Sequence, residues 1–264
     1  TGVQTCALPI WNMKPLEIKH RVIGGGEPLI CVPVVEQDAQ SVIREITYLS
    51  QSTADMIEWR VDAFRDFTDY NAIRSVFEAV APLLGEKLFL YTFRTAHQGG
   101  MAQVKAEQLD DLHDLAAESG CVDLVDLEFF EEDRPLHKIK RLREMGVSVI
   151  ASHHDFEQTP SPEVMKMLLE KMCTGGADIV KLAVMPQNYK DVLNLLDVTA
   201  QFREENPDTP VITMSMGSLG GISRISGETF GSCVTFGAHE KPSAPGQFAM
   251  KELRQMLDTI HASS

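Results

Sequence analysis

The chain has 264 residues, 44% of them apolar, which is enough to bury a sizeable core in one large α/β domain or two small ones. Its formal net charge of −14 argues against nucleic acid as the main partner, because phosphate binding needs a basic surface, but a local arginine cluster can still hold a small anionic substrate. No apolar run reaches the ~18 residues of a membrane span, so we expect no membrane partner.

The cysteines indicate neither a disulfide framework nor a zinc site. They are odd in number, widely spaced and lack a C-x-x-C pair: Cys6, Cys31, Cys121, Cys173 and Cys233. This usage predicts a reducing, cytoplasmic compartment.

Residues 1–12 fit nothing that follows them and lack the basic and apolar regions of a signal peptide. We expect a non-native or disordered extension there, ahead of a single catalytic domain at 13–264.

The remaining chain alternates between strand-like and helix-like segments. Residues 16–23 read as one arm of a hairpin that turns at the three glycines 24–26 and leads into a core strand at 28–34. Further strands are predicted at 55–61, 87–94, 122–128, 147–152, 178–184, 209–214 and 233–236. Helices are predicted after each strand, at 36–50, 69–84, 105–119, 133–145, 162–173, 189–206, 223–230 and 246–261.

Strict alternation of strand and helix implies parallel strands, and eight such repeats predict an α/β fold, a (β/α)8 TIM barrel with an N-terminal β-hairpin. A doubly wound open sheet is the competing architecture. It usually has fewer strands, and no G-x-G-x-x-G motif follows the first strand here. No shift in composition marks a linker between two domains.

The strand at 178–184 carries a lysine, Lys181, in the middle of an aliphatic run bounded by Gly175-Gly176 and Pro186. A fully buried lysine is rare unless it is paired or functional. One interpretation is a strand-end lysine that extends to solvent. The other is a desolvated amine that attacks a carbonyl group as a Schiff-base nucleophile.

Polar residues gather at the carboxyl ends of the other predicted strands, where catalytic groups of such barrels lie. With a period of two, Glu58 and Arg60 face the barrel interior, opposite Ile57 and Trp59. The strand-end set consists of Glu58, Arg60, Arg94, Asp126, Glu128, Ser152, His153, His154, Asp155, Arg224, Ser243 and Gln247. Each alone has an ordinary structural explanation, but chance placement would scatter them over both ends of the barrel.

This set is suited to imine chemistry. Lys181 can form an imine with a ketone, and positive charge on neighbouring arginines would favour the neutral amine. His154 is the natural general acid and base, and Arg224 can hold a carboxylate bidentately. Arg60, Arg94 and Glu58 can hydrogen-bond ring hydroxyl groups. The residues alone leave two readings open: a Schiff-base lyase or aldolase for a small anionic polyol, and a non-catalytic barrel that binds sugar acids.

The chain resembles the type I 3-dehydroquinate dehydratases from about Met13 to its end. The matching motifs, in order and with the spacing of the family, are Glu58-Trp59-Arg60-Val61-Asp62, Thr92-Phe93-Arg94, His154-Asp155-Phe156, Ile179 to Pro186, Ser223-Arg224 and Ser243-Ala244-Pro245-Gly246-Gln247.

The resemblance implies a homodimeric barrel enzyme of the shikimate pathway that uses neither a metal nor an organic cofactor. It implies that Lys181 forms an imine with 3-dehydroquinate and that His154 is the general acid and base, with His153 non-catalytic. The remaining motif residues are implied to bind substrate, with Ser243 and Gln247 in a closing loop: Glu58, Arg60, Arg94, Arg224, Ser243 and Gln247.

One position departs from the family pattern. Four residues after Arg94, where the family usually has a glutamate that hydrogen-bonds the catalytic histidine, this chain has Gln98. Glutamine keeps the carbonyl acceptor but lacks the charge. We hypothesise that His154 is less favoured as imidazolium than in relatives, and we expect activity to be retained over the alternative of an inactive homologue.

Overall fold

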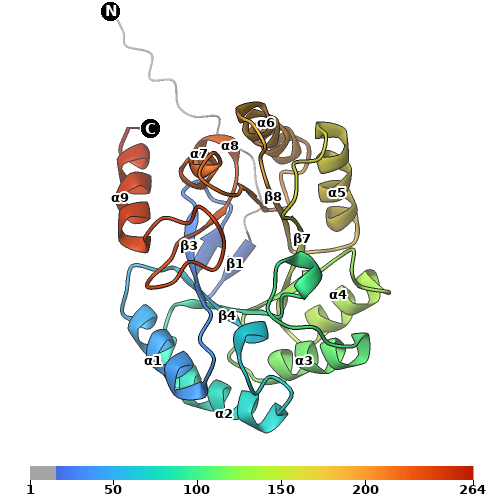
Figure 1. Ribbon diagram of the computed structural model, residues 1–264, viewed down its shortest axis with the longest axis vertical. Helices are drawn as coiled ribbons and strands as arrows, with labels where there is room; N and C mark the ends of the chain where they lie inside the picture. Colours follow the sequence, from blue (N-terminus) through green and yellow to red (C-terminus); the bar gives the residue numbers. More distant parts are fainter. Residues whose placement is uncertain (1–15, 264) are drawn as a thin grey trace, which may run out of the picture.

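A ring of eight parallel strands forms the centre of the part of the chain that the computed structural model describes, residues 16–263 (Figure 1). The strand order is β10-β3-β4-β5-β6-β7-β8-β9. The ring closes between β9 and β10, where the backbone N–H of Cys233 donates to the carbonyl of Val211 at 2.8 Å. The predicted (β/α)8 barrel with an N-terminal hairpin is confirmed.

The barrel strands are β3 (Leu29–Val34), β4 (Met56–Arg60), β5 (Leu88–Thr92), β6 (Leu124–Glu128), β7 (Ser148–Asp155), β8 (Ile179–Val184), β9 (Val211–Ser215) and β10 (Val234–Phe236). The helices outside them are α1 (Ala39–Ser50), α2 (Tyr70–Val80), α3 (Ala106–Glu118), α4 (Pro135–Glu144), α5 (Pro162–Thr174), α6 (Tyr189–Glu205), α7 (Gly221–Ile225), α8 (Gly227–Phe230) and α9 (Met250–His261). Short 3-10 turns occur at Val61–Ala63, Ala81–Leu83 and Ala96–Gln98.

Alternation along each strand divides the core into two layers. Inward side chains such as Met56, Leu90 and Ile179 pack together inside the barrel. Outward side chains such as Trp59 and Val180 pack against the helices. Since β4 places Ile57 and Trp59 in the outer layer, Glu58 and Arg60 face inward, as the period of two predicts.

The N-terminal hairpin differs from the prediction. Its strands are β1 (Leu16–Ile18) and β2 (Arg21–Ile23), and the turn lies at Lys19 and His20, not at the glycines 24–26. Both turn residues have positive φ, 47° and 64°, the pattern of a type I′ turn in residues that rarely adopt it. The glycines instead lead from β2 toward the first barrel strand. The prediction of a turn at the glycines is therefore wrong, because Lys19 and His20 adopt the turn conformation that glycine usually supplies.

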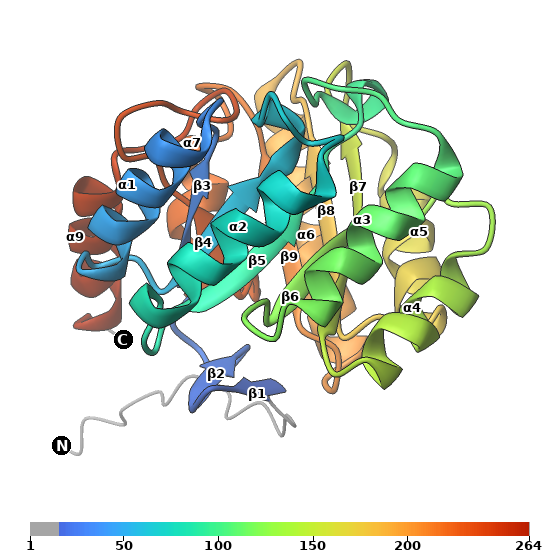
Figure 2. The ribbon, with the colours of Figure 1, turned by 90° about the horizontal axis from the view of Figure 1, so that it is seen from below.

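The hairpin covers the amino-terminal end of the barrel, opposite the strand ends that carry the polar residues (Figure 2). Lys19 pairs with Asp123, just before β6, at 2.8 Å, and Arg21 pairs with Asp55, just before β4, at 2.8 Å. Ile23 packs into the inner layer. This end of the barrel is thereby closed by structural contacts.

Most other predicted boundaries move by one to four residues, and the larger differences lie near the carboxyl ends of the strands. β7 continues to Asp155, because its last residues keep pairing with β8, so His154 lies on a strand opposite Ala183. Two short helices, α7 and α8, replace the single one expected at 223–230, and the last helix begins at Met250 and not at 246.

The extension expected at 1–12 lies outside the described residues. Among those described, no helix has the length and apolar character needed to cross a membrane.

Replacing His20 by glycine should stabilise the fold. His20 is an exposed turn residue with φ of 64°, and a left-handed conformation costs an L-residue roughly 1–2 kcal/mol, part of which is offset by the greater chain entropy of glycine. We expect a stabilisation of about 0.5 kcal/mol and a higher Tm. His137→Gly, at an exposed position within α4, should instead lower the Tm, because glycine is a poorer helix former than histidine by roughly a few tenths of a kcal/mol. Equal shifts in both variants would contradict the assignment of strain to the turn.

Candidate active site

A small cavity of about 40 Å³ lies at the carboxyl ends of the barrel strands. It collects eight of the nine residues predicted from the sequence to form the site: Glu58, Arg60, Arg94, Gln98, His154, Lys181, Ser243 and Gln247. Gly99, Phe156, Met216, Phe236 and Ala244 complete its lining. Residues separated by nearly two hundred positions in the chain thus meet in one place.

Lys181 lies inside the barrel on β8, with a side chain that is 4% exposed. Its Nζ donates to Oδ2 of Asp126 at 3.1 Å and stands 4.4 Å from the centre of the Phe236 ring. Ile179 and Ala183 flank it on the same inward face. The lysine is therefore buried and paired, and not a strand-end side chain that extends to solvent.

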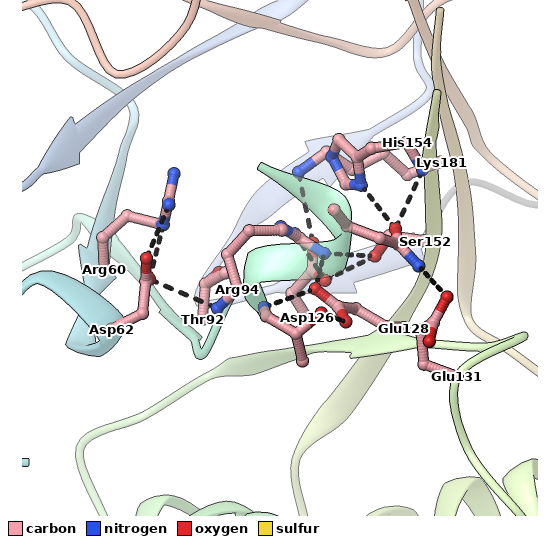
Figure 3. A network of polar contacts seen from close by, with 12 residues as sticks. Arg60, Asp62, Thr92, Arg94, Asp126, Glu128, Glu131, Ser152, His154 and Lys181 are labelled. Carbon is pink, nitrogen blue, oxygen red and sulfur yellow. Dashed lines mark hydrogen bonds and ion pairs between the residues drawn. The ribbon is translucent and has the colours of Figure 1, made fainter. Parts of the chain in front are cut away.

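Asp126 and Arg94 form the centre of a buried polar network (Figure 3). Arg94 Nη2 contacts Asp126 Oδ1 at 2.8 Å, and Arg94 Nη1 contacts Glu128 at 2.9 Å and Ser152 Oγ at 3.0 Å. Ser152 Oγ also donates to Asp126 Oδ1 at 2.6 Å. Burial alone would raise the pKa of Asp126, but the charges of Arg94 and Lys181 outweigh it and lower the pKa to about 2. Asp126 is an ionised carboxylate at any ordinary pH.

The other two charged residues on β4 and its end are also fixed by neighbours. Glu58 accepts a hydrogen bond from Thr92 Oγ1 at 2.8 Å. Arg60 donates through Nε and Nη2 to the two oxygens of Asp62, each at 2.8 Å. A planar guanidinium held at two points has little freedom, so Arg60 presents its remaining edge in a fixed orientation.

His154 is bound to Gln98 in a way that defines its tautomer. Gln98 Oε1 accepts the backbone N–H of His154 at 2.9 Å and lies 3.1 Å from the ring atom Nδ1. Because the backbone N–H needs an acceptor, the amide oxygen, and not the nitrogen, must face His154. The neutral ring then carries its proton on Nδ1 and leaves Nε2 free to act as a base.

Burial, followed by the positive charges of Arg94, Lys181 and Arg60, holds the pKa of His154 well below its usual range. The neutral imidazole is therefore the resting form near neutrality. Gln98 itself is 1% exposed, and its Nε2 lies 3.5 Å from Glu131. Gln98 thus supplies a hydrogen-bond acceptor to His154 without a negative charge, as the hypothesis requires.

Arg224 is the one predicted site residue that does not line the cavity. Its Nη2 donates to the carbonyl of Pro245 at 3.0 Å, in the loop that contains Ser243 and Gln247. Its Nε and Nη1 are buried without a hydrogen-bond partner, and burial lowers its pKa to about 10. Buried guanidinium donors without acceptors are costly, so this position is suited to receive an anion.

The loop that follows β10 closes over the cavity. Gln247 and Ser243 bond to each other, with Gln247 Oε1 accepting the backbone N–H of Ser243 at 2.8 Å. The Gly217 N–H donates to the Pro245 carbonyl at 3.1 Å, which ties this loop to the loop after β9. Since one water needs about 10–15 Å³, the 40 Å³ cavity has room for about three waters, and the loop must move to admit a ring-sized molecule.

Asp126, Glu128 and Ser152 are among the strand-end polar residues predicted from the sequence, but no role was predicted for them. The period of two on β6 and β7 could have found them, since it puts all three on the inward face. Asp62 belongs to a matched motif but was assigned no role, because it lies in the turn just after β4, where the period no longer applies.

A closed barrel of parallel strands that brings a buried lysine, a neutral histidine and several arginines to the strand ends defines a (β/α)8-barrel enzyme. Residues 30–264 match the family model of type I 3-dehydroquinase. The chain therefore belongs to this family.

Several relatives have been described or solved. The chain is 41% identical over 250 residues to the 3-dehydroquinate dehydratase of Syntrophotalea carbinolica, which covers 94% of this chain and 99% of that protein, and 40% identical to that of Escherichia coli over the same shares.

Among solved structures, the type I enzyme of Clostridium difficile, obtained with covalently modified comenic acid, superposes with a TM-score of 0.92 at 38% identity, over 96% of this chain and 100% of that one. The Geobacillus kaustophilus dehydratase gives 0.92 at 35% identity, over 95% and 98%.

Gly246→Ala should weaken substrate binding by opposing closure of the loop. Gly246 has φ of +78°, and an added Cβ would lie 2.3 Å from the carbonyl oxygen of Gly217. If the fraction of molecules with the loop closed falls to about a tenth of its wild-type value, the apparent substrate affinity falls about tenfold. A KM about tenfold higher than that of the wild type would report this loss.

Gly120→Ala is the matched control, because Gly120 has φ of +70° with nothing near its added Cβ. Both variants carry the same kind of backbone strain, but only Gly246→Ala adds the close contact with Gly217. A KM that rises equally in the two would show that strain, and not the contact with Gly217, is responsible.

Proposed function

We propose that this enzyme dehydrates 3-dehydroquinate to 3-dehydroshikimate in the shikimate pathway, through an imine on Lys181. The observation that carries the proposal is the buried Lys181 amine in one cavity with the His154 imidazole. Membership of the type I 3-dehydroquinase family, and relatives named 3-dehydroquinate dehydratase, support the choice of substrate.

The first stage joins substrate and lysine. Once Lys181 has given up its ammonium proton, its amine adds to the ketone carbon to give a carbinolamine, and the carbinolamine hydroxyl takes a proton and leaves as water. The product is a protonated imine, or iminium, in which the lysine nitrogen is doubly bonded to the former ketone carbon. His154, which lines the same cavity, would give and take the protons of these water steps.

The second stage is the dehydration itself. His154 Nε2 removes a proton from the carbon next to the iminium, and the electron pair moves toward nitrogen to give a neutral enamine. The imidazolium then gives its proton to the β-hydroxyl, which leaves as water while the nitrogen returns to an iminium. Water hydrolyses this iminium, releases the product and restores Lys181.

The charged residues around the reacting atoms would bind the substrate. Arg224, with buried donors that lack acceptors, would hold the substrate carboxylate once the loop at 243–247 has opened and closed again. Arg60 and Glu58 face the cavity in fixed orientations and would bind ring hydroxyls. Arg94 is held by Asp126 and Glu128, so its positive charge rather than a free fork would face the substrate.

The setting of the enzyme is proposed on other grounds. The four cysteines within the described residues are unpaired, which supports a reducing cytoplasm.

The resemblance supports a homodimer that needs no metal or organic cofactor. Exposed apolar side chains on neighbouring helices, Val164 and Met167 on α5 and Leu193 on α6, offer surface for a second copy, and a sedimentation mass of one chain would rule the dimer out.

Borohydride treatment in the presence of 3-dehydroquinate should label Lys181 covalently, because reduction converts the imine to a stable secondary amine. Mass spectrometry of a protease digest would locate the adduct. Lys181→Met should lose both the label and turnover, and Lys171→Met, on α5, should keep both. Turnover by the wild-type enzyme with no adduct at Lys181 would overturn the mechanism.

Gln98→Glu should shift the pH dependence of kcat toward higher pH. The added carboxylate would lie at hydrogen-bond distance from Nδ1 and favour the imidazolium, so the low pKa of His154 should rise. A nearby opposite charge typically moves a pKa by about one unit or more, and the acidic limb of the profile should move by that amount. Gln158→Glu adds the same charge at an exposed loop position and should leave the profile in place. Overlapping profiles for wild type and Gln98→Glu would refute the hypothesis.

A further inference from the structure

Asp126 is a buried, ionised group beside the Lys181 nitrogen, and it has no role in the steps proposed for Lys181 and His154. We propose that Asp126 accepts the N–H of the Lys181 iminium, stabilises the positive charge that develops there when water leaves, and fixes the plane of the C=N bond. The inference rests on the imine proposed for Lys181.

The contact geometry suits this role. Nζ of Lys181 lies 3.1 Å from Asp126 Oδ2, and both side chains are almost fully buried, with 4% and 0% exposed. An iminium nitrogen carries the lysine carbon, the doubly bonded substrate carbon and one hydrogen, all in one plane. When the single N–H points at Oδ2, the orientation of the C=N bond is fixed, and the position of the substrate carbon is fixed with it.

The carboxylate is itself held in place from its other oxygen. Arg94 Nη2 and Ser152 Oγ both donate to Oδ1, at 2.8 and 2.6 Å, so Oδ2 is the oxygen presented to the lysine (Figure 3). A group that is oriented before the reaction needs no reorganisation when charge develops, which is the condition for electrostatic stabilisation of a transition state. Asp126 acts as a fixed counter-ion.

Charge develops on the nitrogen in both steps that release water. The collapse of the carbinolamine and the departure of the β-hydroxyl from the enamine each turn a neutral nitrogen into an iminium. A carboxylate at hydrogen-bond distance favours both. Abstraction of the proton by His154 discharges the nitrogen, so the benefit of Asp126 belongs to the water-loss steps.

A role as general base fits Asp126 less well. Because its pKa is held near 2, it binds a proton poorly, whereas efficient proton transfer needs a pKa close to the working pH. His154, which is neutral at rest, remains the acid and base.

Asp126→Asn tests the contact with little change in shape. Since Arg94 and Ser152 donate to the Oδ1 side, the asparagine oxygen should stay there and its NH₂ group should face Lys181, where an acceptor is needed. We expect kcat to fall about tenfold to a hundredfold, the effect of losing a buried hydrogen bond to a charged group. The fraction trapped by borohydride with 3-dehydroshikimate, which measures the iminium at equilibrium, should fall with it.

Two measurements separate this role from a general disturbance of the site. Quinate has an alcohol in place of the ketone and cannot form an imine. Calorimetry should therefore find that Asp126→Asn binds quinate with an affinity within about threefold of the wild type, a smaller change than the loss of one hydrogen bond would cause. Glu128→Gln is the matched substitution: it takes a carboxylate from Arg94 but does not touch Lys181, so it should change quinate binding more than the trapped fraction.

Ser152→Ala offers a second test that leaves the charge of Asp126 intact. It removes one of the two donors that orient Oδ1, and kcat should fall by about threefold with quinate binding unchanged, as for the loss of one modest hydrogen bond.

The inference is overturned if Asp126→Asn is trapped as well as the wild type, or if quinate binding is lost in step with trapping. A wild-type enzyme that turns over without being trapped would overturn the imine itself and this inference with it.

Discussion

The ion pair between Lys181 and Asp126, with Arg94 on the far side of the carboxylate, is the interaction on which the site depends. A cation in the interior of a barrel is strongly disfavoured unless a charge of opposite sign lies beside it. Asp126 supplies that charge on β6, and Arg94 on the strand end of β5 balances it in turn. Lys181, Asp126 and Arg94 therefore hold one another in place, so the Lys181 amine is buried and oriented.

The same network reaches His154 and the other strand ends around the cavity. Arg94 connects Asp126 with Glu128 and Ser152, and its charge, with that of Lys181 and Arg60, helps to keep His154 neutral. Gln98 adds orientation without charge, because its oxygen is required by the backbone N–H of His154. In this chain the tautomer of the histidine is thus set by hydrogen bonding, while its protonation is set by burial and by the surrounding cations.

Most of the barrel, and most of the residues that line the cavity, were predictable from the sequence. Alternating strand and helix patterns predicted the parallel ring, and the period of two correctly turned Glu58 and Arg60 inward. The prediction failed at the hairpin, where Lys19 and His20 adopt positive φ despite having side chains. The contacts of Lys19 with Asp123 and of Arg21 with Asp55 stabilise that turn, and they join residues far apart in the chain. Local propensity has no information about such contacts.

By itself, the sequence determined which face of each strand is polar and at which end of the barrel those polar groups lie, because both follow from local periodicity and from the parallel direction of the strands. It also specified the family through Lys181, His154 and their motifs. Only the tertiary structure decided which charges touch. That Asp126 faces the lysine, that Gln98 presents its oxygen to His154, and that Arg224 bonds to the closing loop at Pro245 depend on the register of neighbouring strands and on distances of a few ångströms. Electrostatic and hydrogen-bond energies change steeply over such distances, whereas the pattern of residues along the chain does not contain them.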